Sequence, residues 1–211
     1  MSTDKAVITE LIAGLNKRNI LGIYCEDTNA AHKKILELIG ESATIGFAGS
    51  QTLEQLEIIE MLESRGNLVY NQYNPQLSRD ESMKVRKQGA LADYYLTSAN
   101  AISKQGELFF LSAYGHRIAG IADAKNVIVV CGINKIAESA QAAMERARTL
   151  ATPLNCKRLK WDTPCAQDGV CRSEICFSPQ YVRMCCQWLI IESEMNPDRM
   201  TVIIVGENLG F

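Results

Sequence analysis

Residues 127–135 have the sequence Val-Ile-Val-Val-Cys-Gly-Ile-Asn-Lys, and this stretch decides the fold class. Its first five residues are apolar and mostly β-branched, which is typical of a strand buried on both faces of a sheet. Gly132 opens a turn, and residues 137–150 after it are rich in Ala, Glu and Arg, which favour helix. A buried strand that turns directly into a helix is the repeating unit of an α/β fold.

The rest of the chain repeats this alternation. We expect helices at 7–15, 30–39, 52–63, 79–91 and 137–150, and strands at 20–25, 44–47, 68–70, 94–97, 108–111 and 127–131. Ser2-Thr3-Asp4 and Asp27-Thr28-Asn29 are expected to cap the first two helices, and Gly40 to end the second.

Two β-rich runs, 188–191 and 201–205, close the chain and are joined by the turn Asn196-Pro197-Asp198. The expected architecture is one α/β domain over residues 1–211, with a layered, mostly parallel sheet flanked by helices. The C-terminal strand pair is expected to pack onto this body.

The composition excludes two classes of protein. The chain has 211 residues, 47% of them hydrophobic, and 22 basic against 24 acidic side chains give a net charge of −2. No basic excess is present to attract phosphates, so nucleic-acid binding is not expected. The apolar runs at 127–131 and 188–191 fall far short of the ~20 residues that span a bilayer. The first residues show no basic segment followed by an apolar one, so we expect a cytoplasmic protein.

A first candidate site is the turn Gly46-Phe47-Ala48-Gly49-Ser50-Gln51-Thr52, between an expected strand and an expected helix. Gly46 and Gly49 would let backbone N–H groups converge on an anion, and Ser50, Gln51 and Thr52 add side-chain donors. The alternative is a tight turn in which Ser or Thr caps the helix. The turn matches neither G-x-G-x-x-G nor Gly-Lys-[Ser/Thr], so nothing favours a dinucleotide or a nucleoside triphosphate.

A second candidate site follows the expected strand 94–97. In open α/β sheets, ligands bind beyond the carboxyl ends of the strands, where Ser98 and Asn100 would lie. Gly115-His116-Arg117 could add a guanidinium for a carboxylate and an imidazole for proton transfer. Lys135, beyond the strand 127–131, could point into the same crevice. The alternatives are that Arg117 pairs with a structural carboxylate, His116 packs, and Lys135 is solvated.

Several segments resemble the lactate-utilisation (LUD) domain family: 98–102, 115–119, 127–136 and 205–211. With the turn at 46–52 they cover the chain from about residue 40 to its end. The resemblance implies a fold like that of ribose phosphate isomerase, glucosamine phosphate deaminase and the CoA transferases. It also implies a role in oxidising lactate to pyruvate, alone or with partner subunits.

One residue departs from the isomerases of this fold group. Where methylthioribose phosphate isomerase and its relatives have Gly-Ala-Asp, with the aspartate as acid and base, this chain has Ser98-Ala99-Asn100. An amide does not transfer protons near neutral pH, so Asn100 can orient a ligand but cannot act as that acid or base.

A third candidate site is the loop 161–186, which carries Cys165, Cys171, Cys176 and Cys185. Four thiolates could bind zinc or an iron–sulfur cluster, although no C-x2-C pair supports either. The alternatives are redox-active thiols, or buried reduced cysteines that act as small apolar side chains.

We therefore expect a component of lactate oxidation that binds a small anion, either a carboxylate or a sugar phosphate, with redox partner subunits or as a homo-oligomer. Two other functions stay open. One is a metal or iron–sulfur electron-transfer subunit. The other is a non-catalytic ligand sensor on a sugar-phosphate-isomerase-like fold.

Overall fold

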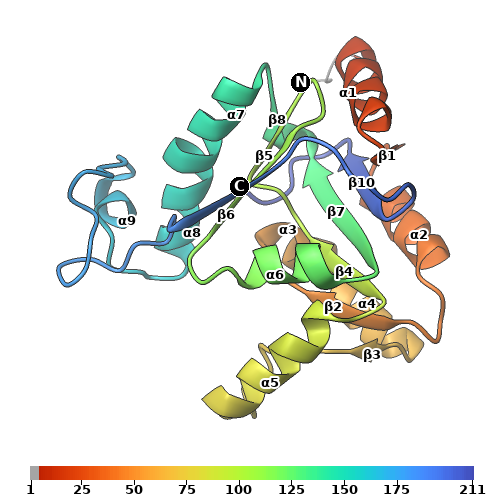
Figure 1. Cartoon of the computed structure of the whole chain (residues 1–211), viewed down its shortest axis with the longest axis horizontal. Helices are drawn as coiled ribbons and strands as arrows, with labels where there is room; N and C mark the ends of the chain where they lie inside the picture. The colour runs from red at the N-terminus through yellow and green to blue at the C-terminus, as the bar shows by residue number, and fades with distance from the viewer. Residues whose placement is uncertain (1–4) are drawn as a thin grey trace.

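A computed structural model describes residues 5–211, so the expected cap at Ser2-Thr3-Asp4 lies outside the described residues. Within them, six strands form one all-parallel sheet (Figure 1). Its order is β1 (Leu21–Cys25), β10 (Met200–Val205), β7 (Asn126–Gly132), β4 (Tyr94–Thr97), β2 (Thr44–Phe47) and β3 (Leu68–Val69). The neighbouring strands β10 and β7, which lie inside the sheet, are covered on both faces, which explains their apolar runs at 202–205 and 127–131.

One face of this sheet is covered by α2 (Thr28–Leu38), α3 (Gln51–Leu56) and α4 (Ile58–Arg65). The apolar side chains of these helices pack on Ile128, Val130 and Ile203 of β7 and β10. Asp27 caps α2 by accepting a hydrogen bond from the Ala30 amide at 2.8 Å. The helix ends at Leu38 with Ile39 as its C-cap, so the expected Gly40 lies just beyond the helix.

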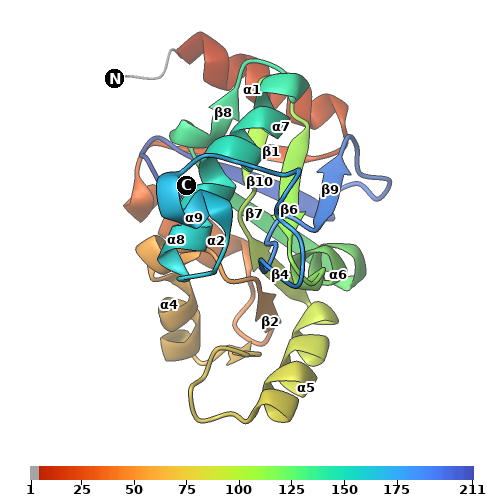
Figure 2. The ribbon, with the colours of Figure 1, turned by 90° about the vertical axis from the view of Figure 1, so that its left-hand side faces the viewer.

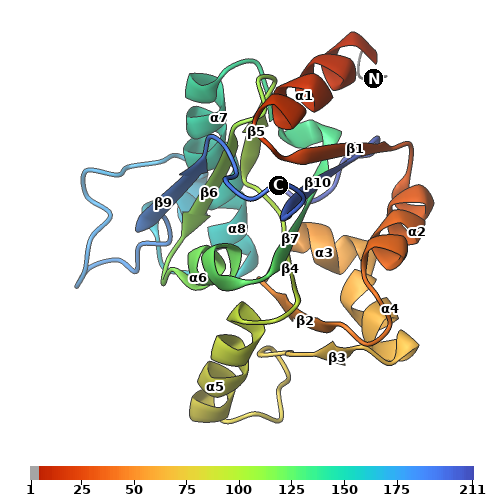
Figure 3. The ribbon, with the colours of Figure 1, turned by 45° about the vertical axis from the view of Figure 1, so that its right-hand side comes forward.

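The other face is covered by α1 (Lys5–Lys17), α6 (His116–Asp123) and a small mixed sheet. The small sheet has the order β8 (Ile136–Ala137), β5 (Ala101–Ser103), β6 (Leu108–Ser112) and β9 (Gln187–Ile191). Figure 3 shows β6 and β9 side by side, away from β1 and β10.

A long helical segment lies against the outer face of the small sheet. It starts with α7 (Ala140–Arg146), continues through a π-helical stretch, Ala147–Ala151, and ends with α8 (Thr152–Arg158). Figure 2 views the molecule from the side on which α8 and the short α9 (Pro164–Asp168) lie. The remaining helix, α5 (Arg79–Ala90), begins with a capping box between Ser78 and Glu81 and packs on β2.

The expected α/β class with a mostly parallel sheet flanked by helices is confirmed. The expected C-terminal strand pair is wrong, because β9 pairs with β6 in the small sheet and β10 pairs with β1 and β7 in the main one. The strand expected at 108–111 also lies in the small sheet.

Helix boundaries differ from expectation in two places. The helix expected over 52–63 is broken at Glu57, whose φ of 51° interrupts the helical hydrogen bonds between α3 and α4. The helix expected over 137–150 starts at Ala140 and runs on to Arg158 through the π-helical stretch. The elements β5, α6 and α9 were not expected from the sequence. Across residues 5–211, no helix is both long enough and apolar enough to span a bilayer.

Candidate functional site

The carboxyl ends of β2, β4, β7 and β10 meet at one edge of the main sheet, because these neighbouring strands are parallel. After β2 the chain turns to α3 and α4 on one face of the sheet. After β4 it turns to the small sheet and α6 on the opposite face. This divergence between neighbouring strands opens the crevice in which ligands of open α/β sheets bind.

Lys135 lies at the bottom of this crevice, in the 3₁₀ turn that follows β7, and is 4% exposed. Its ammonium group donates three hydrogen bonds, to Ser98 Oγ (2.7 Å), Thr52 Oγ1 (2.8 Å) and the Ala99 carbonyl (3.1 Å). All three acceptors are uncharged. Burial lowers the pKa of Lys135 to about 8, and the charges of Arg117 and Arg146 act in the same direction.

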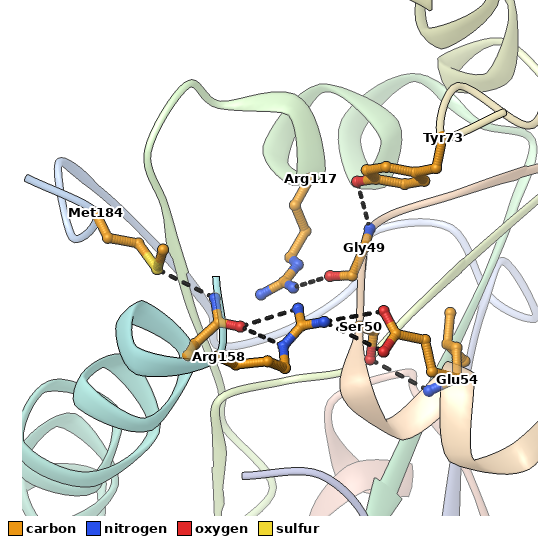
Figure 4. Close-up of polar contacts among 9 residues, drawn as sticks. Gly49, Ser50, Glu54, Tyr73, Arg117, Arg158 and Met184 are labelled. Atoms are coloured by element: carbon orange, nitrogen blue, oxygen red, sulfur yellow. Dashed lines mark hydrogen bonds and ion pairs between the residues drawn. The ribbon is translucent and has the colours of Figure 1, made fainter. Parts of the chain in front are cut away.

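Arg117 reaches the crevice from the first turn of α6. Its Nη2 donates to the Gly49 carbonyl at 3.0 Å, and its Nη1 donates to Asn100 Oδ1 at 3.2 Å (Figure 4 shows the Gly49 contact). Its Nε is enclosed, with no hydrogen-bond partner among residues 5–211. Burial lowers the pKa of Arg117 from its ordinary high value, although a guanidinium remains charged at physiological pH.

These two cations line a cavity of about 200 Å³. All of the lining residues lie within residues 5–211, and none of them is Asp or Glu. Nine of the predicted site residues line it, and they are Gly49, Ser50, Gln51, Thr52, Ser98, Asn100, His116, Arg117 and Lys135. The structure therefore brings the first two predicted sites together into one pocket.

Two predicted site residues lie outside the pocket lining. Gly46 lies in β2, where an added Cβ would come within 1.9 Å of the Gly89 carbonyl oxygen of α5. Its absent side chain lets α5 approach the sheet closely. Gly115 precedes α6 with φ 75°, a left-handed conformation that favours glycine, and its amide donates to Ser112 Oγ. Both glycines shape the backbone around the pocket.

Several pocket side chains also stabilise local structure. Ser50 caps α3, accepting from the Leu53 amide at 3.4 Å, as the alternative interpretation of the turn predicted. Asn100 Oδ1 accepts from the Leu111 amide at 2.8 Å as well as from Arg117, so the amide holds the guanidinium in place. Whether Asn100 also orients a ligand, as the sequence predicts, stays a prediction.

His116 opens α6 at the pocket wall, with its ring stacked on that of Tyr114 (centroids 5.4 Å apart). Burial lowers its pKa below the usual value, and the nearby charge of Arg86 lowers it further. The imidazole is therefore neutral at pH 7 and has a nitrogen able to accept a proton.

Sequence reasoning missed part of the pocket wall. Tyr73, from the loop before α5, accepts a hydrogen bond from the Gly49 amide at 2.7 Å. Asn155 of α8, and Trp161 and Met184 from the cysteine-bearing segment, close the opposite side. No local motif marks these residues, because only the chain path brings them to the strand ends.

The four cysteines predicted as metal ligands do not fit a metal. Within residues 5–211, no three His, Cys, Asp or Glu side chains are arranged so that they could hold a metal ion. Cys165 packs with Cys156 and Met184, whereas Cys185 packs beneath the small sheet. Burial raises the pKa of Cys171 and Cys176 above the usual thiol value, and the neighbouring thiols Cys165 and Cys185 raise it further. Cys165, Cys176 and Cys185 are buried, and Cys171 is partly exposed.

The uncompensated charge of Lys135 predicts a stability effect. Below pH 8 this lysine is charged in both the folded and the unfolded chain, and the buried charge destabilises the fold. Between pH 8 and about 10.4 the folded protein has released the proton that the unfolded chain keeps, so stability rises with pH. We expect Lys135→Met to raise the free energy of unfolding at pH 7, with an advantage over the unmodified protein that shrinks by about 2 kcal/mol at pH 9.5.

Urea unfolding of both proteins at the two pH values measures this difference. Groups common to the two chains cancel in the comparison. An advantage that does not depend on pH would show that Lys135 titrates normally.

The fold and the pocket together define an α/β protein with an open parallel sheet. At the carboxyl ends of its strands lies a pocket lined by two cationic side chains. The chain belongs to the LUD domain family, whose model matches residues 8–205. The crystal structure of a DUF162 family protein from Deinococcus radiodurans is similar, with 14% sequence identity, coverage of 96% of this chain and 98% of that chain, and a TM-score of 0.53. At this identity the likeness shows the fold alone. A search of curated proteins gave no significant match.

Proposed function

We propose that this protein binds a small organic anion in the strand-end pocket, and that the anion is a carboxylate such as lactate or pyruvate. In this proposal the chain is a component of lactate-to-pyruvate oxidation. Membership of the LUD domain family supports the pathway, and the charge of the pocket supports the class of ligand.

One observation carries the proposal: Arg117 and Lys135 are two cations in one pocket whose described lining contains no Asp or Glu side chain. Burying a charge without an opposite charge costs free energy. Two positive charges without a carboxylate side chain beside them therefore favour an anionic ligand as the missing partner. An anionic ligand would supply the missing charge. A guanidinium can hold both oxygens of a carboxylate through parallel hydrogen bonds.

The remaining pocket residues suit a 2-hydroxy acid. Asn100 fixes the Arg117 guanidinium, which would hold the carboxylate. Neutral His116 can accept a proton from the substrate hydroxyl. Oxidation to the 2-oxo acid breaks the hydroxyl O–H bond and the Cα–H bond. We propose that His116 takes the hydroxyl proton and that a redox partner subunit takes the Cα hydrogen with both electrons, as a hydride equivalent.

A sugar phosphate is the other ligand class that this charge would attract. The Asn100 amide argues against isomerisation by the aspartate route, because it cannot transfer the proton. Without that reaction, membership of the LUD domain family favours a carboxylate over a phosphate ester.

Binding measured by titration calorimetry tests the proposal, with lactate and pyruvate as ligands and uncharged lactamide as the matched control. We expect lactamide to bind at least tenfold more weakly at pH 7. We also expect carboxylate affinity to fall above pH 8, by up to about tenfold per pH unit, as Lys135 loses its charge.

The variant Lys135→Met tests whether the pH dependence of binding comes from Lys135. It is expected to bind lactate weakly, with no fall in affinity across pH 8. Equal binding of lactate and lactamide by the unmodified protein would reject the anion site.

A further inference from the structure

A second cavity of about 310 Å³ adjoins the anion pocket, and we refer to it as the side pocket. The two cavities share one wall, which is formed by Ala48, Gly49, Ser50, Tyr73, Asn155 and Leu159. Gly49 lies at the junction. Its carbonyl accepts from Arg117 of the anion pocket, and its amide donates to the hydroxyl of Tyr73 (Figure 4).

The most buried side chains that line the side pocket are apolar. Phe47, Leu53 and Ile59 come from β2, α3 and α4, and each is less than a tenth exposed. Two further apolar side chains border it and are left uncovered, Tyr73 at 57% exposed and Leu159 at 44%. The Tyr73 and Phe47 rings lie 5.7 Å apart at an angle of 49°, an arrangement typical of packed aromatic rings.

Charged groups stay at the rim of the side pocket. Arg158 of α8 forms an ion pair with Glu54 of α3 at 3.1 Å and donates to Asn155 Oδ1, as Figure 4 shows. This bridge holds α8 over α3, on the border of the side pocket. Arg158 and Glu54 are thereby paired, unlike Arg117 and Lys135 in the neighbouring pocket, whereas Glu60, which also lines the side pocket, forms no ion pair with the described residues.

We infer that the ligand is a 2-hydroxy or 2-oxo carboxylate whose side chain is larger than the methyl group of lactate, either branched or aromatic. This inference rests on the proposed function, because the carboxylate is placed at Arg117 and Lys135. The side chain then passes Gly49 and lies between Tyr73 and Leu159 in the side pocket.

The cavity sizes support the inference. The anion pocket alone, at about 200 Å³, is below the roughly 300–1,000 Å³ of ordinary ligand pockets, whereas the side pocket extends it into that range. Apolar area buried in the side pocket adds affinity that lactate cannot gain.

Titration calorimetry at pH 7 with lactate and 3-phenyllactate tests the inference. We expect 3-phenyllactate to bind at least tenfold more tightly. Binding of lactate with equal or weaker binding of 3-phenyllactate would overturn the side-pocket inference and leave the anion site intact. Binding of neither compound would overturn both the inference and the proposed function.

Two pairs of variants test where the phenyl group binds. For each variant, the measured ratio is the affinity for 3-phenyllactate divided by the affinity for lactate. Tyr73→Ala removes the aromatic wall and is expected to lower the ratio at least fivefold, whereas Tyr73→Phe keeps the ring and most of the ratio. Leu159→Gln is expected to lower the ratio about threefold. Leu154 is an exposed leucine of α8, the helix that Leu159 follows, and it lines neither cavity. Leu154→Gln should therefore leave both affinities unchanged. An unchanged ratio in both Tyr73→Ala and Leu159→Gln would place the phenyl group elsewhere and overturn the inference.

Discussion

Arg117→Gln is expected to weaken lactate and pyruvate binding by at least tenfold, and by up to about a hundredfold, in titration calorimetry at pH 7. Tenfold corresponds to about 1.4 kcal/mol, and losing one side of a buried, hydrogen-bonded charge pair costs about 2–5 kcal/mol. Glutamine keeps an amide that can donate to the Gly49 carbonyl or to Asn100, so the pocket wall keeps part of its hydrogen bonding.

Stability distinguishes loss of the site from loss of the fold in this variant. The Arg117 guanidinium is held by uncharged acceptors and has one donor without a partner among the described residues. Removing its charge should therefore change the free energy of unfolding little, in either direction.

Arg86→Gln is the matched control, because Arg86 is a neighbouring arginine that contacts His116 but does not line the pocket. We expect it to lower the affinity less than threefold. An equal loss in both variants would mean that the general positive potential of this region, rather than a specific carboxylate contact, attracts the ligand. Unchanged binding in Arg117→Gln would remove this residue from the site.

Gly46→Ala is expected to lower the free energy of unfolding by about 3 kcal/mol or more. The new Cβ would come within 1.9 Å of the Gly89 carbonyl oxygen and 2.8 Å of its Cα, and these backbone atoms cannot rotate away. Helix α5 would have to move off β2 to relieve the overlap. Overpacking of this kind typically costs about 1–3 kcal/mol, and more where only backbone can yield. In thermal unfolding the midpoint should fall by about 6–12 °C.

Gly40→Ala provides the comparison for this change. A Cβ at residue 40 meets nothing within 4 Å, so stability should stay within about 0.5 kcal/mol of the unmodified protein. The folded fraction of Gly46→Ala should still bind lactate, because residue 46 does not line the pocket. A stability loss below 1 kcal/mol would mean that α5 lies farther from β2 than the structure places it.

Local chemistry predicted much of the fold. The capping side chain of Asp27 and the apolar runs at 44–47, 94–97 and 127–131 mark elements that the structure contains almost where they were expected. Each signal acts within a few residues, since a cap bonds an amide three positions away and an apolar strand requires only burial. The strand-end loops carrying Ser98, Asn100 and Lys135 could likewise be located, because the carboxyl ends of neighbouring parallel strands share an edge.

Strand pairing could not be predicted in this way. The strands β9 and β10 are neighbours in sequence, yet β10 lies between β1 and β7 inside the main sheet and β9 lies at the edge of the small one. An apolar strand pairs equally well with any partner that buries it, so the choice depends on the packing of the whole chain. The break at Glu57 has the same origin, because the residues around it could continue a helix and Leu56, Ile58 and Leu62 are fully buried on both sides of it.

The sequence by itself determined the α/β class, the cationic residues Arg117 and Lys135, and their position after strands. The tertiary structure alone decided that these charges share one pocket whose described lining holds no Asp or Glu side chain, and that Tyr73 and Leu159 line a side pocket beside it. The physical reason is the distance along the chain over which each effect acts. Propensity and periodicity act between neighbours in the chain, whereas an unpaired charge or an empty cavity is defined by residues far apart in sequence that only the packed sheets and helices bring together.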